Sequence, residues 1–267
     1  MQNIDENPKT ALITGASAGI GLAFAREFAE QGFDVVLVAR REDKLNEIAA
    51  EIKAQHGAMA YVIAADLADP ESPQMIFDSV TSKGINIDAL VNNAGYAIEG
   101  GFIDSAWKEH LDFIQVLNTS LVHLCHLFAT PMKQREYGRI INIASIAAFS
   151  PQLNGSLYGA AKSFVLDFTQ AIDLELKPHN VFCTALCPGF TYSEFHDTMG
   201  VREAVSKLPK FLWMDSQTVA KEGYNAVMGG KSVYINGLVN QGVSQVLAAL
   251  PLRVKQYLAE KQSIFEN

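Results

Sequence analysis

Short apolar runs alternate with stretches of helical apolar spacing along the whole chain. Seven of the runs have the length of strands, and they lie at 9–14, 34–39, 58–65, 87–91, 139–144, 180–187 and 232–235. Between most of them, apolar residues recur every three or four positions, which predicts amphipathic helices. Strands alternating with helices favour right-handed crossovers and a parallel sheet covered on both faces. The pattern therefore predicts one doubly wound α/β domain over 1–267 with a mostly parallel seven-stranded sheet.

Three longer stretches complete this pattern. Residues 107–132 carry one apolar stripe and predict a single long amphipathic helix, and apolar spacing at 216–228 and 243–258 predicts two more helical regions. Residues 190–215 are rich in apolar and aromatic side chains without regular spacing. Long connections of this kind often contact ligands, so we expect an apolar substrate loop or lid there.

A glycine-rich turn follows the first strand. The run 9–14 leads directly into Gly15-Ala16-Ser17-Ala18-Gly19-Ile20-Gly21, and a helix pattern comes next. This arrangement presents free backbone N–H groups to a phosphate, and glycine allows the backbone to approach the anion closely. The spacing differs from the Gly-x-Gly-x-x-Gly fingerprint, but its position predicts a Rossmann-type dinucleotide site. Its expected contacts are Gly15, Ser17, Gly19, Ile20 and Gly21.

The second strand ends at Ala39-Arg40-Arg41. In dinucleotide folds an acid at this place accepts from the ribose 2′-OH, whereas an arginine accommodates a 2′-phosphate. A guanidinium matches a phosphate in charge and geometry. We therefore expect NADP rather than NAD, although Arg40 and Arg41 alternatively only solvate the start of the next helix.

Polar residues follow the ends of several other predicted strands. Asp66 is placed to accept from an adenine amino group or to begin a turn, and Asn93 and Ser145 follow later strands. The carboxyl ends of parallel strands meet at one edge, where such sheets bind ligands. These residues should therefore converge with Gly15 and Arg40.

Tyr158 and Lys162 are the candidate catalytic pair. They are four residues apart in a helical pattern, so they should project from one face. A nearby ammonium favours the phenolate and should lower the pKa of Tyr158, which suits general acid–base catalysis. The Ser145 hydroxyl would polarise the same substrate oxygen. The alternative is a half-buried tyrosine beside a solvated lysine.

Asn118 lies among apolar residues of the long predicted helix. A buried amide needs hydrogen-bond partners, so this residue is either structural or holds a catalytic water. His123 and His126 are three apart on the same helix. Because no carboxylate or cysteine lies at ligand spacing, we expect no metal.

Composition excludes several classes of partner. The chain has 21 Lys and Arg against 29 Asp and Glu, a net charge of −8, and no basic block. This argues against nucleic acid and anionic membrane surfaces as partners. No stretch approaches the ~20 apolar residues of a membrane span. The acidic N-terminus lacks the pattern of a signal peptide, and three cysteines in apolar runs suit a reducing compartment. We expect a cytoplasmic protein.

With these residues in view, the chain resembles the short-chain dehydrogenase/reductase family, in its compact NADP-preferring branch, over nearly its full length. The motifs fall in family order and at family spacing: Thr14-Gly15-x-x-x-Gly19-x-Gly21, Asn92-Asn93-Ala94-Gly95, Asn118, Ser145, Tyr158-x-x-x-Lys162 and Pro188-Gly189.

The resemblance implies hydride transfer between NADP(H) and a small apolar carbonyl or alcohol. It implies that Tyr158 is the acid/base, Lys162 lowers its pKa and binds the nicotinamide ribose, Ser145 orients the carbonyl, and Asn118 holds a relay water. The further implied cofactor contacts are Leu67, Asn93, Ala94, Gly95, Pro188, Gly189, Thr191 and Ser193. Family members commonly form homodimers or homotetramers through the two long helices.

Two features depart from the family pattern. Ala18 stands where NADP-using members often have a basic residue, so the NADP prediction depends on Arg40 and Arg41. Ser193 stands where a threonine is usual, which keeps the hydroxyl.

Two alternatives remain open. A nucleotide-sugar epimerase or dehydratase would share Tyr-x-x-x-Lys but usually has a Gly-x-x-Gly-x-x-Gly turn and a longer C-terminal region. A non-enzymatic NADP sensor would not need Asn118, Ser145, Tyr158 and Lys162 together.

Overall fold

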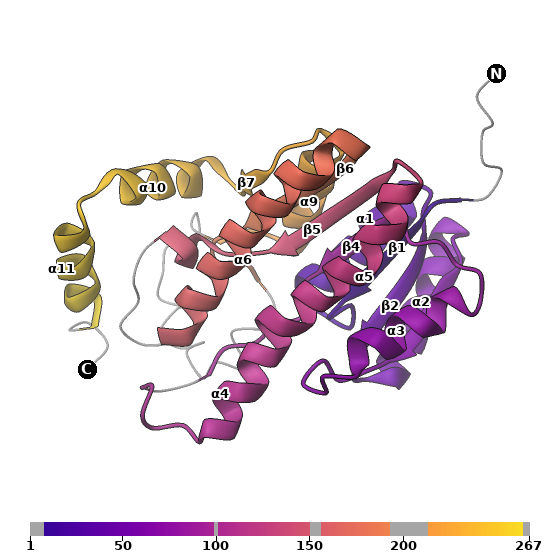
Figure 1. Ribbon diagram of the computed structural model, residues 1–267, viewed down its shortest axis with the longest axis horizontal. Coiled ribbons are helices and arrows are strands. Elements are labelled where there is room, and N and C mark those ends of the chain that lie inside the picture. The colour runs from indigo at the N-terminus through magenta and orange to yellow at the C-terminus, as the bar shows by residue number, and fades with distance from the viewer. Residues whose placement is uncertain (1–7, 99–100, 150–155, 193–212, 264–267) are drawn as a thin grey trace.

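Seven parallel strands form the centre of the protein (Figure 1), in a computed structural model that describes residues 8–98, 101–149, 156–192 and 213–263. The strands are β1 (Thr10–Thr14), β2 (Asp34–Ala39), β3 (Ala60–Ala64), β4 (Ala89–Asn92), β5 (Gly138–Ile143), β6 (Val181–Cys187) and β7 (Val233–Ile235). Their order in the sheet is β3-β2-β1-β4-β5-β6-β7. Every neighbouring pair is parallel. The predicted doubly wound α/β fold is confirmed.

The strand order reverses direction between β1 and β4. From β1 the chain builds outward through β2 and β3, then returns to add β4 on the other side of β1. In open α/β sheets, this reversal leaves a crevice at the carboxyl ends of the strands, where ligands bind. The fold therefore directs attention to the residues that follow β1 and β4.

Helices cover both faces of the sheet. On one face lie α1 (Gly19–Glu30), α2 (Glu42–His56) and α9 (Ser216–Met228). The other face carries α3 (Ser72–Thr81), α4 (Trp107–Ile114), α5 (Ser120–Gln134) and α6 (Ser156–Leu176). Short 3₁₀ turns lie at Ile146–Phe149 and Lys177–His179, and α10 (Leu238–Ala249) and α11 (Leu252–Ser263) follow β7.

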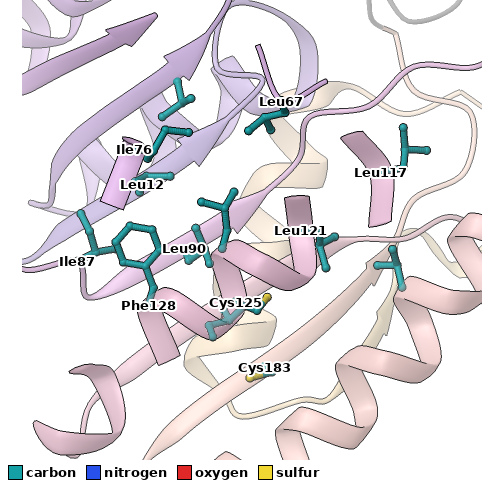
Figure 2. Packing of buried hydrophobic residues seen from close by; sticks show 14 of the residues in the cluster. Leu12, Leu67, Ile76, Ile87, Leu90, Leu117, Leu121, Cys125, Phe128 and Cys183 are labelled. Atoms are coloured by element: carbon teal, nitrogen blue, oxygen red, sulfur yellow. The ribbon is translucent and has the colours of Figure 1, made fainter. Parts of the chain in front are cut away.

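Successive side chains of each strand point to opposite faces of the sheet, and this alternation divides the core into two halves. Leu12, Leu90 and Ile140 are register partners and belong to the cluster beneath α3, α5 and α6. The next residue on each strand belongs to the cluster beneath α1, α2 and α9. Figure 2 shows the first cluster, where Leu12 and Leu90 lie near Phe128 of α5. Both faces are apolar because each is covered, as expected for a parallel sheet.

The long helix predicted over 107–132 is present as Trp107–Gln134, but it contains an irregular turn. A π-helical turn, Gln115–Thr119, separates α4 from α5, and α5 continues to Gln134. Among the described residues, the run Trp107–Gln134 is long and apolar enough to be a candidate membrane span, with a mean hydropathy of 1.2. However, its side chains Phe113, Leu117, Leu121 and Phe128 are buried in the core beside the sheet, as in a core helix.

Other boundaries differ from the prediction by a few residues. β3 is shorter than the predicted strand 58–65. The predicted C-terminal helical region is divided into α10 and α11, because Pro251 lacks a backbone N–H and interrupts the helical hydrogen bonding. Helix α9 has the predicted limits. Asp215 caps it by accepting hydrogen bonds from the backbone N–H groups of Gln217 and Thr218, which satisfies two otherwise unpaired donors.

Replacing Leu90 by alanine should strongly destabilise the fold. Leu90 is fully buried in β4, and buried Leu→Ala changes typically cost about 2–5 kcal/mol through lost burial and a residual cavity. The matched control Leu174→Ala affects a side chain that is 77 % exposed, so its cost should stay within about 0.5 kcal/mol. Urea unfolding monitored by circular dichroism measures both, and equal losses would contradict this placement of the core.

Candidate active site

The Thr14 hydroxyl joins the glycine-rich turn to the end of β4. Its Oγ1 accepts hydrogen bonds from the backbone N–H groups of Asn93 and Ala94, both at 3.0 Å. In return, Asn93 Nδ2 donates to the carbonyl oxygens of Thr14 (3.0 Å) and Gly15 (3.3 Å). The Asn93 side chain therefore holds the turn in place. Thr14 was not among the predicted site residues, although a hydroxyl at the last position of a strand is a readable signal.

Glycine is required at two positions of this turn. Gly15 has φ = 66°, a conformation that other residues rarely adopt. A Cβ at Gly21 would overlap the carbonyl oxygen of Gly15. Helix α1 begins here with Ala18 as its N-cap and without an acidic residue in its first turn. The first-turn N–H groups are thus suited to receive a phosphate.

The two arginines lie beside this turn. Arg41 Nη2 donates to Ser17 Oγ at 3.0 Å, which links the end of β2 to the glycine-rich turn. Arg40 and Arg41 also line a hollow that continues along the start of α2 to Glu47. Arg41 therefore does more than solvate the helix start, and Arg40 lies exposed beside it at the same edge.

Asp66 begins a turn. Its Oδ1 accepts a hydrogen bond from the Ala68 backbone N–H at 3.1 Å, while its side chain stays exposed at the same edge. The neighbouring Leu67 is buried, and its carbonyl accepts from Ser120 Oγ at 2.9 Å. Asp66 thus begins a turn, and because its carboxylate is exposed at the same edge, the adenine contact stays a prediction.

Ser145, Tyr158 and Lys162 lie together at the ends of β5 and α6. A hydrogen bond connects the side chains of Tyr158 and Ser145, and Ser145 Oγ also accepts from the Ala147 backbone N–H at 3.1 Å. Lys162 is buried, with Nζ donating to the Ile143 carbonyl at 2.7 Å. Its Nζ lies 5.7 Å from the centre of the Tyr158 ring. The predicted grouping of these three side chains is therefore present.

The predicted lowering of the Tyr158 pKa is wrong for this structure. Burial raises the pKa of Tyr158 to about 12, and the Ser145 hydrogen bond offsets only part of that effect. Burial also lowers the pKa of Lys162 to about 8, while Cys187 acts in the opposite direction. The ammonium is directed to a carbonyl rather than to the phenol, so desolvation dominates both groups.

Asn118 lies in the π-helical turn. Its Nδ2 donates to the Ala161 carbonyl at 3.1 Å, directly before Lys162 in α6. π-Turns inside helices occur frequently at functional sites. The amide therefore connects the two long helices next to the candidate catalytic pair, and the helical pattern alone did not reveal the π-turn.

The segment after β6 borders the same edge. The Pro188 carbonyl accepts from the Ile146 backbone N–H at 3.1 Å, directly beside Ser145. Gly189 packs tightly against Asn240 of α10, because a Cβ there would overlap that side chain. Thr191 is buried and its Oγ1 donates to the Gly189 carbonyl at 3.1 Å. The predicted contact Ser193 lies outside the described residues.

A buried polar network that sequence spacing did not reveal lies beneath the site. Asn92 Nδ2 donates to Asn142 Oδ1 at 2.9 Å, and Asn142 Nδ2 donates to Thr169 Oγ1 at 2.9 Å. Cys125 donates to Asn142 Oδ1 at 3.6 Å. The network connects β4, β5, α5 and α6. Asn142 within Ile140-Ile141-Asn142-Ile143 was its only clear sequence signal.

Aromatic side chains flank both described ends of the predicted substrate loop. Tyr192 stacks on Trp213 with ring centres 4.8 Å apart, and Phe190 lies 5.7 Å from the same ring. Residues 193–212 of the loop are outside the described part of the chain. Within the described part, no group of three or more His, Cys, Asp or Glu side chains forms a metal site.

Comparisons with known proteins find relatives of this chain. A family model for short chain dehydrogenases matches residues 9–203. Serine 3-dehydrogenase of Agrobacterium fabrum is 33 % identical over 245 residues, which covers 90 % of this chain and 96 % of that protein. The NADP-dependent 3-hydroxy acid dehydrogenase YdfG of Shigella flexneri is 33 % identical over 67 % of this chain and 71 % of its own length.

A solved structure is similar throughout. It is a short-chain dehydrogenase from Sphingobium yanoikuyae in complex with NADPH. The two structures superimpose with a TM-score of 0.80 at 30 % identity, covering 97 % of this chain and 95 % of that one.

Replacing Lys162 by methionine should change how stability depends on pH. Below about pH 8 both the folded and unfolded chains carry this ammonium, so its burial cost is complete. Between about 8 and 10.5 the unfolded chain binds more protons, so this lysine makes the free energy of unfolding rise with pH. The free energy of unfolding of the wild type minus that of Lys162→Met, measured by urea unfolding, should therefore rise across this window. A value that stays constant or falls would contradict a buried ammonium.

Proposed function

Because the chain belongs to the short-chain dehydrogenase family, we propose that it transfers a hydride between NADP(H) and a carbonyl/alcohol pair on an apolar substrate. The observation that carries this proposal is the hydrogen-bonded pair Tyr158 and Ser145, beside buried Lys162, at the sheet edge that also carries the glycine-rich turn. A phenol and a hydroxyl that meet in this way suit one substrate oxygen.

The residues at the edge fit a dinucleotide phosphate. Gly21 lies so close to the Gly15 carbonyl that no Cβ fits between them, which keeps the Gly15–Gly21 turn tight, and α1 offers its first-turn N–H groups to a pyrophosphate. Arg40 and Arg41 would hold the 2′-phosphate. The remaining proposed contacts are Ser17, Asp66, Leu67, Asn93, Ala94, Gly95, Lys162, Pro188, Gly189, Thr191 and Ser193. The NADPH-bound relative and the NADP-dependent relative support NADP over NAD.

Tyr158 would move the proton and Ser145 would orient the oxygen. The raised pKa of Tyr158 keeps the phenol protonated at neutral pH, so it can donate to a carbonyl oxygen during reduction and accept during oxidation. Ser145 would donate a second hydrogen bond to the same oxygen. The bound NADPH supplies the hydride, and the protein supplies position and proton transfer.

Lys162 and Asn118 would support this step from α6 and the π-turn. At pH 7 Lys162 is charged despite its lowered pKa of about 8, which suits contact with a ribose hydroxyl. Asn118 bonds to the Ala161 carbonyl and is proposed to hold a relay water, as the family resemblance implies.

The substrate is proposed to be apolar. Phe190, Tyr192 and Trp213 supply an aromatic surface after β6, and the rest of the 190–215 segment would cover it. Cytoplasmic location is also a proposal, consistent with three free, buried cysteines, as is a homodimeric or homotetrameric state. An epimerase or a sensor is less well supported, because the relatives named above are dehydrogenases.

Replacing Tyr158 by phenylalanine should lower turnover about 100-fold or more, because the proton donor is lost. NADPH affinity should stay within about threefold, since the ring remains. The assay is absorbance at 340 nm with a panel of ketones and aldehydes, combined with NADPH titration. Tyr137→Phe is the matched control, because Tyr137 precedes β5 at the opposite edge. Near-normal turnover in Tyr158→Phe would remove this residue from the mechanism.

Replacing both Arg40 and Arg41 by alanine should weaken NADPH binding about 10- to 100-fold, because hydrogen bonds to charged groups contribute roughly 1.5–3 kcal/mol. NADH binding should change little, since it lacks the 2′-phosphate. Fluorescence titration measures both cofactors. Arg26→Ala is the control, as Arg26 pairs with Glu51 away from the edge. Comparable or tighter NADH binding by the wild type would overturn the NADP assignment.

A further inference from the structure

The backbone around Ser145 is held by three successive residues at the end of β6. The residues before and after Ser145 donate their N–H groups to the carbonyls of Leu186 and Pro188, at 2.7 and 3.1 Å. Between these two bonds, the Ser145 N–H donates to Cys187 Sγ. The two outer bonds use backbone carbonyls, which any residue supplies. The middle bond uses a side chain, so it depends on the residue at position 187.

Cys187 is a neutral thiol that can accept this bond. It is the last residue of β6 and is fully buried. Burial raises the pKa of Cys187 to about 12, so the thiol keeps its proton at neutral pH. Sγ directs that proton toward the Ala185 carbonyl at 3.9 Å, a long contact that suits a weak donor. The sulfur lone pairs therefore remain available to the Ser145 N–H.

Lys162 ends at the same level of the sheet. Its Nζ donates to the Ile143 carbonyl at 2.7 Å, and Ile143 is the register partner of Leu186, the residue directly before Cys187. Lys162 and Cys187 accordingly interact electrostatically. The thiol therefore borders two members of the candidate active site, because it binds the Ser145 backbone and lies near the Lys162 ammonium.

We propose that Cys187 is a positioning residue, which holds Ser145 where its hydroxyl meets the Tyr158 phenol and the substrate oxygen; this inference rests on the hydride transfer proposed above. Ser145 Oγ is fixed from its other side by the Ala147 N–H at 3.1 Å. Without the sulfur, the Ser145 N–H would be buried without a partner, which costs free energy. The backbone would shift to recover a partner, and a misplacement of about 1 Å can cost about 100-fold in rate.

Cys183 provides a matched control. It lies four residues before Cys187 on β6, so both side chains point to the same face of the sheet. It is also fully buried, and Figure 2 shows it within the apolar cluster. Alanine at either position removes one buried sulfur, so the loss of packing should be similar. A difference in activity between the two variants therefore reports the contact with Ser145.

Turnover is measured at 340 nm with NADPH and the panel of ketones and aldehydes. Cys187→Ala should lower turnover about 10-fold or more, whereas Cys183→Ala should leave it nearly unchanged. Cys187→Ser keeps an acceptor and should restore turnover to within about threefold of the wild type. A packing role predicts no such recovery, because a buried hydroxyl suits an apolar site less well than the alanine methyl group. NADPH affinity, from fluorescence titration, should change little in all three variants.

Amide hydrogen exchange measured by NMR tests the contact without a substrate. In Cys187→Ala the Ser145 amide should exchange at least about tenfold faster than in the wild type, because its acceptor is lost. The amides of Ala144 and Ile146 are internal references, since their carbonyl acceptors remain. Cys183→Ala should change the three rates by a common factor.

Equal turnover in Cys187→Ala and Cys183→Ala would overturn the proposal, as would an unchanged ratio of Ser145 exchange to that of its two neighbours. A serine variant no more active than the alanine variant would also overturn it. If circular dichroism shows Cys187→Ala unfolded, Cys187→Val, which fills the space without an acceptor, takes its place. A wild type that oxidises NADPH with none of the carbonyl compounds would instead overturn the proposed hydride transfer, and the exchange rates would still decide whether Cys187 holds Ser145.

Discussion

The hydrogen bonds of the Thr14 hydroxyl hold the switch point of the sheet together. The hydroxyl receives two backbone N–H groups from the start of the β4 loop, and Asn93 returns two bonds to the glycine-rich turn. These bonds act at the place where strand order reverses, so the turn and the β4 loop form one unit. The glycine-rich turn, where the phosphate is proposed to bind, thereby keeps a fixed position relative to the end of β4.

Helix α6 is attached to β5 and to the π-turn by polar contacts. Lys162 bonds to the Ile143 carbonyl, the Ala161 carbonyl receives Asn118, and Thr169 receives Asn142. Burying an ammonium and several amides costs free energy unless each finds a partner. These contacts offset that cost and fix the position of Tyr158 against Ser145. The same burial explains why the phenol retains its proton.

The sequence predicted those features that depend on local pattern and parallel topology. The seven strands and the convergence of Gly15, Arg40, Asp66, Asn93 and Ser145 follow from periodicity, because the carboxyl ends of parallel strands share an edge. The pKa of Tyr158 was mispredicted because desolvation depends on packing from several elements, which residue spacing does not contain. The π-turn at Asn118 was missed because apolar residues continue through it with nearly helical spacing. The buried hydrogen bond between Asn92 and Asn142 was missed because it joins residues that are 50 apart in the sequence.

The π-turn also couples two parts of the protein through geometry. Its hydrogen bonds span one residue more than those of an α-helix, so one turn uses about one additional residue. The additional residue is absorbed within that turn, and α4 keeps nearly the axial orientation relative to α5 that a regular helix would give it. A residue inserted or deleted in the regular part of α4 or α5 would instead rotate the segment beyond it by about 100°, and His110 and Trp107 would then face different neighbours. The irregular turn thus lets Asn118 reach α6 without changing which side of α4 faces the core, and changes of length on either side of it should be tolerated poorly.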